Sequence, residues 1–335
     1  MNGVTYKKRI IIRPQEKFLR YLCIKKEFCM KRYICIDIGG TTIKYGVIQE
    51  NGIFEMTKEM PTQAKEGGGA GIIDKIKRIV SAFLEQYEVS GICVSTAGMV
   101  DWKKGVITYA SSLIPNYTGT KIKEIMENAF HLPCEVENDV NCAGLAEYYA
   151  GAGKGCESSL CLTIGTGIGG AFVSDGKIFH GFSGSGCEVG YLHLPGGAFQ
   201  DLAASSVLVK NVIQKKGLKE GDLNGKMIFD KAKEGDRDCI EAIDTMCDIL
   251  GMGIANLCYV LNPEIVVLGG GIMVQREYLE PKIRQSLKKY LLSSIAEHTK
   301  LAFAQNKNQA GMLGAYYHFK EQHAEGVDLL PAHKS

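Results

Sequence analysis

Three absences in the sequence narrow the kind of protein it encodes. Net charge is nearly absent: 39 basic and 37 acidic residues among 335 leave a formal charge of +2, which gives no reason to expect nucleic acid or an anionic membrane as a partner. No apolar run approaches the roughly 20 residues of a membrane span. A secretory signal is missing too, because the only compact apolar run near the start, residues 10–12, is too short.

Paired cysteines are also missing. None of the 12 cysteines forms a Cys-x-x-Cys pair, and several, including Cys35, Cys93 and Cys161, lie in apolar patterns where cysteine behaves as a small hydrophobic residue. Without a signal peptide we expect the thiols to be reduced and the protein to be cytoplasmic. The length of 335 residues predicts about two globular domains.

Residues 1–29 form a basic N-terminal extension, with eight Lys or Arg against two acidic residues. We expect this extension to be disordered or dispensable, since Met30 looks like a natural start. The alternative is a basic interaction arm. At about 30 residues the extension is too short for a helix-turn-helix DNA-binding domain.

The stretch Tyr33–Phe54 organises the rest of the chain. It predicts two strands joined by the turn Gly39–Thr42 and closed at Asn51-Gly52, a pair that tolerates positive φ at both positions. Glycines let backbone N–H groups approach a phosphate closely, and Lys44 adds a further donor. Asp37 would hold a hydrated metal ion, because a carboxylate repels phosphate. The alternative is a tight hairpin whose glycines serve geometry alone.

A second copy of this pattern favours phosphate binding. Cys161–Phe179 repeats the strand, a glycine turn at Gly165–Gly170 and a hairpin at Asp175-Gly176. Each half then has a further apolar strand that ends in small residues, 91–94 and 265–268. This internal duplication predicts two α/β halves that face each other across a cleft.

Asp139 is the candidate catalytic residue. The segment Glu135–Asn141 predicts a short strand followed by a helix that begins at Asn138 or Asp139. Either residue could simply cap that helix. Asp139 could also accept a proton from an attacking sugar hydroxyl, and we expect the helix N-terminus to keep its carboxylate ionised. Both roles are compatible.

Five motifs in order resemble the ROK family (repressors, open reading frames and kinases) across residues 30–320. They are Asp37-x-Gly-Gly-Thr41, Glu137-Asn138-Asp139-x-Asn141, Gly165-Thr-Gly-Ile-Gly169, Gly186-Cys-Glu188-Val-Gly190 and Leu268-Gly-Gly-Gly271. The resemblance implies a duplicated two-domain actin-like ATPase (ribonuclease H-like) fold. It also implies ATP- and Mg²⁺-dependent phosphorylation of a hexose or hexoside, most often at the 6-hydroxyl, with Asp139 as the base.

The same resemblance assigns roles to further residues and implies a homodimer. The residues expected to face the ATP phosphates are Gly39, Gly40, Thr41, Thr42, Lys44, Gly165, Thr166 and Gly167, with Asp37 holding Mg²⁺ through water. Those expected to face adenosine are Gly269, Gly270 and Gly271, and those expected to contact sugar are Gly98, Asn138, Asp139, Glu188, Tyr191 and Asp201.

The sequence departs from the family at the sugar site. Tyr191 stands where typical members have a histidine, and residues 192–199 contain one histidine and no cysteine where those members have a zinc loop. Zinc needs about four ligands, so we expect no structural zinc. Asp201 replaces a glutamate across a deletion. The chain looks like the zinc-free branch of β-glucoside kinases, N-acetylmannosamine kinases and glucokinases, and the sugar stays open.

The predicted division of the chain places residues 30–140 and 306–320 in a small first domain and residues 141–305 in a larger second one, with 321–335 as a tail. Residues 60–71 predict a polar loop before a helix over 72–87. The alternative function is a non-catalytic sugar-sensing regulator. Regulators of this family carry an N-terminal winged-helix domain of some 60–80 residues, more than this chain has there.

Overall fold

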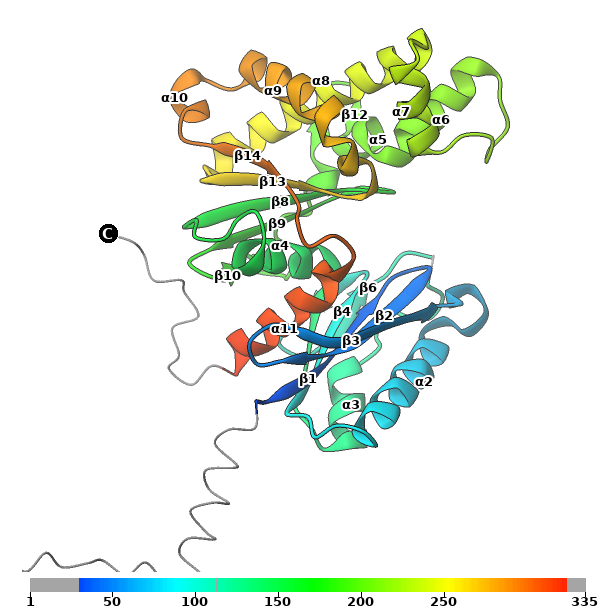
Figure 1. Ribbon diagram of the computed structural model, residues 1–335, viewed down its shortest axis with the longest axis vertical. Helices are drawn as coiled ribbons and strands as arrows, with labels where there is room; N and C mark the ends of the chain where they lie inside the picture. Colours follow the sequence, from blue (N-terminus) through cyan, green and yellow to red (C-terminus); the bar gives the residue numbers. More distant parts are fainter. Residues whose placement is uncertain (1–29, 113, 324–335) are drawn as a thin grey trace, which may run out of the picture.

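The computed structural model describes residues 30–112 and 114–323, so the predictions for residues 1–29 and for most of the tail lie outside the described residues. Two five-stranded sheets dominate the molecule and are stacked with helices between and outside them (Figure 1).

The first sheet has the order β3-β2-β1-β4-β7. Strand β1 pairs with β2 in antiparallel fashion and with β4 in parallel, and Asp37 of β1 lies opposite Lys44 on one side and Ser95 on the other. The bounds of these strands are β1 Arg32–Ile38, β2 Thr42–Gln49, β3 Phe54–Pro61, β4 Gly91–Thr96 and β7 Cys134–Asn138.

The second sheet repeats this topology in the order β10-β9-β8-β13-β14. Strand β8 is antiparallel to β9 and parallel to β13, as β1 is to β2 and β4. The internal duplication predicted from the glycine turns is therefore confirmed. The bounds are β8 Ser158–Ile164, β9 Ile168–Ser174, β10 Lys177–Ile178, β13 Ile265–Gly269 and β14 Lys300–Phe303.

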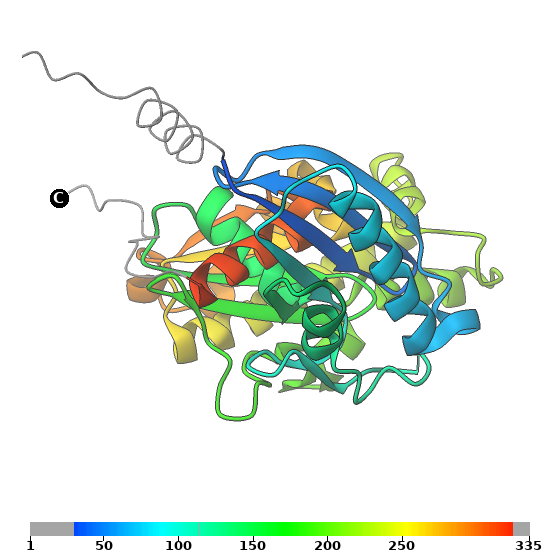
Figure 2. The same cartoon turned by 90° about the horizontal axis from the view of Figure 1, so that it is seen from below.

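Two helices, α4 (Asp139–Ala150) and α11 (Ala310–Gln322), lie between the sheets and pack on each other (Figures 1 and 2). Helix α11 packs on the first sheet and α4 on the second, so the chain passes between the halves twice. The contact is close, because a Cβ at Gly314 would collide with the Cys142 carbonyl group.

Strand alternation explains these layers. Ile34, Ile36 and Ile38 of β1 face the outer helices, whereas Tyr33 and Cys35 face α11. Successive side chains of a strand point to opposite faces, so an uninterrupted apolar strand is buried on both sides. The outer helices are α2 Ala64–Leu84 and α3 Ile122–Phe130 on the first sheet, and α5 Phe199–Ala203, α6 Ser205–Lys216, α7 Gly225–Lys233, α8 Arg237–Leu261, α9 Arg276–Tyr290 and α10 Ser293–Ala296 on the second half.

Short elements complete the fold. They are the hairpins β5 Met99–Asp101 with β6 Val106–Tyr109 and β11 His193–Leu194 with β12 Gly197–Ala198, and the 3₁₀ helices η1 Val189–Tyr191, η2 Gly271–Gln275 and η3 Lys307–Gln309. In the described part of the chain, α8 alone is long and apolar enough by length and composition to cross a membrane. Its apolar face packs in the core of the second half, as expected of a buried helix.

Two predictions of local structure are wrong. The 60–71 segment is not a loop: it holds the end of β3 and the start of α2 at Ala64, with a kink at Gly68 (φ 55°) where the Gly69 N–H donates to the Pro115 carbonyl group. At Asn51-Gly52 only the glycine has positive φ, because the connection is longer than two residues.

Candidate active site

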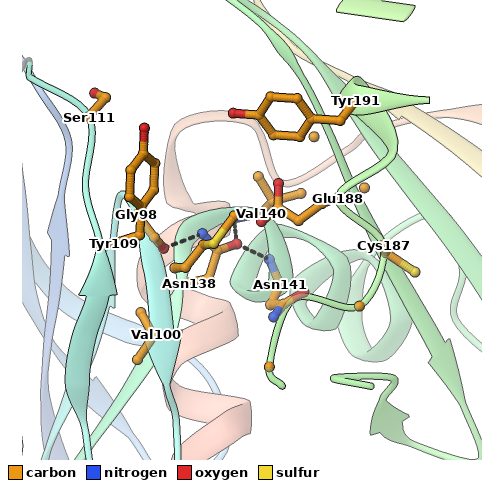
Figure 3. Close-up of a pocket in the computed structure, with 15 residues that line it drawn as sticks. Gly98, Val100, Tyr109, Ser111, Asn138, Val140, Asn141, Cys187, Glu188 and Tyr191 are labelled. Atoms are coloured by element: carbon orange, nitrogen blue, oxygen red, sulfur yellow. Dashed lines mark hydrogen bonds between the residues drawn. The ribbon is translucent and has the colours of Figure 1, made fainter. Parts of the chain in front are cut away.

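A cavity of about 200 Å³ lies between the two halves of the molecule (Figure 3). One wall comes from the first half, from the β5–β6 hairpin and the end of β7. The other comes from the second half, from β9 and the segment that leads into η1. The residues that line the cavity are Gly98, Met99, Val100, Tyr109, Ser111, Asn138, Val140, Asn141, Gly169, Gly170, Gly184, Gly186, Cys187, Glu188 and Tyr191.

Asn138 caps helix α4. Its Oδ1 accepts the N–H groups of Val140 (2.9 Å) and Asn141 (3.1 Å), and its Nδ2 donates to the Gly98 carbonyl oxygen (2.9 Å) and to Asp139 Oδ1 (3.0 Å). The amide is fully engaged with protein groups, so it ties the cavity wall at Gly98 to the helix. The predicted sugar contact of Asn138 stays a prediction.

Asp139 is the first residue of α4 and lies between Asn138 and Val140, which line the cavity, but it is not itself a lining residue. Its Oδ1 accepts the Val140 N–H (2.9 Å). Burial, and then the neighbouring Asp37 carboxylate, raise the pKa of Asp139 from 3.8 to about 7. At a pKa of about 7 the group is only partly ionised near neutral pH, because desolvation outweighs the helix N–H groups that were expected to keep it ionised.

Asp37 is the last residue of β1 on the face that packs against α11. Ser95 donates a hydrogen bond to its Oδ1 (2.7 Å), and Gly311 of α11 packs so closely on the carboxylate that a Cβ there would collide with it. Burial raises the pKa of Asp37, although the Ser95 hydrogen bond and the facing Lys44 oppose the rise. The carboxylates of Asp37 and Asp139 thus lie close enough together for one to raise the pKa of the other, with Lys44 facing Asp37.

The two glycine turns are braced by hydroxyl groups. Thr62 Oγ1 donates to the Gly39 carbonyl oxygen (2.7 Å), and Ser205 Oγ donates to that of Gly165 (2.6 Å). These bonds occupy the two carbonyl groups. The N–H groups of Gly40, Thr41, Thr166 and Gly167 have no acceptor among the described residues. Both turns therefore present free backbone donors, as the phosphate-binding prediction requires.

A second hollow of about 710 Å³ lies beside the Gly269–Gly271 turn, which was predicted to face adenosine. It also contains Phe303, which Arg276 covers with its guanidinium group at 5.4 Å from the ring centre. Neither residue was identified from the sequence, since they come from separate elements, β14 and α9, that only the fold brings together.

A buried polar cluster behind Asn138 was also missed. Glu137 is 1% exposed, and its Oε2 lies 2.6 Å from His180 Nε2, while Oε1 accepts the Asn138 N–H (2.7 Å). Burial alone would raise the pKa of Glu137, but the His180 hydrogen bond and the nearby His318 hold it below its usual value. Trp102 stacks on His180 at 4.6 Å. Glu137 stood in a quoted motif, but no sequence pattern pointed to His180 or Trp102.

The remaining predicted sugar contacts divide into two groups. Glu188 and Tyr191 line the cavity, as Figure 3 shows, whereas Asp201 is exposed in α5 and does not line it. His193, the one histidine of residues 192–199, lies in the β11–β12 hairpin. Among residues 30–112 and 114–323, no three His, Cys, Asp or Glu side chains form a ready metal cluster, and the prediction of no zinc stays untested.

Comparison with known proteins agrees with this geometry. Residues 33–322 match the ROK family. An uncharacterized protein of Clostridium perfringens is 52% identical over 292 residues (87% of this chain, 99% of that protein), and a beta-glucoside kinase of Listeria innocua is 34% identical over 295 residues (85% and 96%). The crystal structure of a ROK family glucokinase from Streptomyces griseus in complex with glucose and AMPPNP superposes with a TM-score of 0.72 at 29% identity, covering 85% of this chain and 97% of that one. The chain therefore belongs to the ROK family, and the predicted actin-like ATPase fold is confirmed.

Proposed function

We propose that this chain is a sugar kinase that transfers the γ-phosphate of ATP to the 6-hydroxyl group of a hexose or hexoside. The observation that carries the proposal is the start of α4, where Asp139 follows the cavity-lining Asn138 and lies close enough to Asp37, beside the first glycine turn, for that carboxylate to raise its pKa. Membership of the ROK family and the named kinases among its relatives support the reaction, and the choice of the 6-hydroxyl group rests on the family.

In this proposal Asp139 is the general base. A base works best when its pKa lies near the operating pH, because it is then partly ionised and still basic enough to accept a proton. The ionised Asp139 takes the proton of the sugar hydroxyl as that oxygen attacks the γ-phosphorus, and the bond from the γ-phosphorus to the β-phosphate oxygen breaks to release ADP. The Asn138 amide holds the helix start and Gly98 in place, and closure of the two halves excludes water as a competing acceptor.

The donor set of the site fits Mg²⁺. Mg²⁺ prefers oxygen ligands and is bound by one or two carboxylates together with substrate phosphates and waters. Asp37 offers such a carboxylate, oriented by Ser95, and it lies close enough to the buried Asp139 to raise the pKa of that second carboxyl group. A bound Mg²⁺ would neutralise charge on the phosphate oxygens.

The test is an assay of ADP release with glucose, cellobiose, N-acetylmannosamine, N-acetylglucosamine, mannose and fructose, each with ATP and Mg²⁺. We expect turnover on at least one sugar and its loss in Asp139→Asn with ATP binding retained. Sugar binding without turnover on any of these would contradict the proposal and favour the regulator. The cytoplasmic location and the homodimer remain proposals, which cell fractionation and light scattering would check.

A further inference from the structure

Two large aromatic side chains stand open at the mouth of the cavity. Tyr109, at the end of β6, is 53% exposed, and Tyr191, at the end of η1, is 56% exposed. Both line the cavity, and they come from opposite halves of the molecule (Figure 3). A ligand that bridges the mouth would therefore touch both.

Contacts within the described part of the protein give these two rings no structural role. Neither phenol group forms a hydrogen bond in the described part of the chain, and neither ring packs on another aromatic ring there. Tyr259 differs: it is 44% exposed, but its hydroxyl group donates to the Tyr290 carbonyl oxygen (3.0 Å) and anchors α8 to α9. Tyr109 and Tyr191 leave apolar ring surface and a free hydroxyl group in water, an arrangement typical of a binding site.

The size of the cavity limits what it encloses. Its volume of about 200 Å³ lies below the roughly 300–1,000 Å³ of pockets that hold drug-sized ligands. One pyranose ring suits a space of this size. A group attached to that ring can extend through the open mouth, where the two tyrosines lie.

The chemistry of the tyrosines matches a second sugar or aryl ring. A pyranose ring has C–H groups on its faces and hydroxyl groups around its edge. An aromatic face packs on the C–H groups of the sugar, and the phenol groups exchange hydrogen bonds with its hydroxyl groups. Two rigid rings on opposite sides also lose little conformational entropy when they clamp a ligand.

We propose that the preferred substrate is a hexoside rather than a free hexose, with its phosphorylated ring in the cavity and its second ring held between Tyr109 and Tyr191. This inference rests on the proposed kinase function. In this proposal Tyr191, which stands where typical family members have a histidine, contacts the second ring that is attached to the sugar.

A neighbouring groove supplies the control. Trp102 and Phe182 line a separate hollow of about 600 Å³, which shares Gly184 with the cavity. There Trp102 already stacks on His180 and has Lys103 at 5.4 Å from its ring centre. Phe182 is fully exposed in that groove. Removing its ring therefore tests whether the second ring of the substrate binds there, without disturbing the core.

The experiment compares kcat/KM for cellobiose and phenyl β-glucoside with kcat/KM for glucose and methyl β-glucoside. We expect the intact protein to favour the two-ring substrates by at least tenfold, and Tyr109→Ala or Tyr191→Ala to lower that preference about tenfold, which corresponds to about 1.4 kcal/mol. Tyr109→Phe should keep most of the preference for phenyl β-glucoside, because the stacking ring remains. Phe182→Ala and Tyr259→Ala should leave the ratio unchanged.

The outcomes separate the two proposals. Turnover of glucose with no preference for a second ring, or a preference that both tyrosine variants retain, overturns the hexoside inference and leaves the kinase function intact. Loss of the preference in Phe182→Ala moves the second ring to the other groove and also overturns it. No turnover of any sugar contradicts the kinase function itself.

Discussion

Replacing Asp139 by asparagine should stabilise the folded protein while it abolishes turnover. The substitution removes a charge that the folded state holds at a cost, since burial and the Asp37 carboxylate raise the pKa of Asp139 from 3.8 to about 7. Asparagine keeps an oxygen that can accept the Val140 N–H, so the helix start remains satisfied. A residue that weakens the fold and is still required for activity is one kept for chemistry.

The size and the sign of the effect follow from proton linkage. Below about pH 4 both the folded and the unfolded chain carry the proton on Asp139. Between about pH 4 and pH 7 only the folded chain keeps it, so the contribution of this group to stability falls as the pH rises. A difference of about three pKa units at 1.36 kcal/mol each gives a full penalty on the order of 4 kcal/mol above pH 7. Asparagine does not titrate, so its advantage should grow over the same range.

Urea unfolding at pH 5 and pH 8, with chelator present so that no cation masks the charge, measures this difference. Asp74→Asn makes the same chemical change at an exposed site on α2 and serves as the matched control. The reasoning fails if the stability of Asp139→Asn relative to the intact protein is the same at both pH values. It also fails if the variant turns over sugar at the normal rate.

Three further predictions test the supports of the site. His180→Ala should lower the free energy of unfolding by about 1–3 kcal/mol and reduce kcat, because the buried Glu137 carboxylate loses a charge-assisted hydrogen bond. His180→Gln should recover much of the stability and of kcat. Equal losses in the two variants, measured by urea unfolding and steady-state assays, would contradict this. Asp37→Ala should raise the Mg²⁺ concentration needed for half-maximal turnover far more than it weakens sugar binding, measured by Mg²⁺ titration and calorimetry; equal effects on both would argue against a metal role. Gly314→Ala should destabilise the protein by about 1–3 kcal/mol or more, because the added Cβ meets the facing carbonyl group of α4. Gly71→Ala, which has open space around it, should leave the stability unchanged. A normal melting temperature for Gly314→Ala would disprove the close packing.

The duplicated fold could be read from the sequence because its signals are local. A strand that runs into glycines and a hairpin occurs twice, at 33–54 and 161–179, and residue type alone narrows the helix cap to Asn138 or Asp139. The prediction of loop over 60–71 failed for the opposite reason. Glycines there serve a long-range contact with Pro115, which no local pattern reveals.

The candidate site was predictable only where its residues form a contiguous motif. Asn138, Asp139 and Glu188 were identified in this way. Tyr109 and His180 were not, because each reaches the site from a different element and gains its role from the partner it meets there. The pKa of Asp139 was misjudged because a sequence shows the helix N-terminus but neither the burial nor the Asp37 carboxylate beside it.

Comparison of the two sheets shows how one topology yields two different halves of a site. Asp37 and Thr163 occupy the same penultimate position of β1 and β8. Asp37 lies between Lys44 and Ser95, whereas the same neighbours of Thr163 are Gly169 and Gly269. The first half thus places charge and hydroxyl groups where the second half has almost no side chain. In the proposed function, this difference would put the carboxylate that handles Mg²⁺ in the first half and leave space for the bulk of the nucleotide beside the second. The proposed phosphoryl transfer would therefore depend on the asymmetry within the repeat more than on the repeat itself.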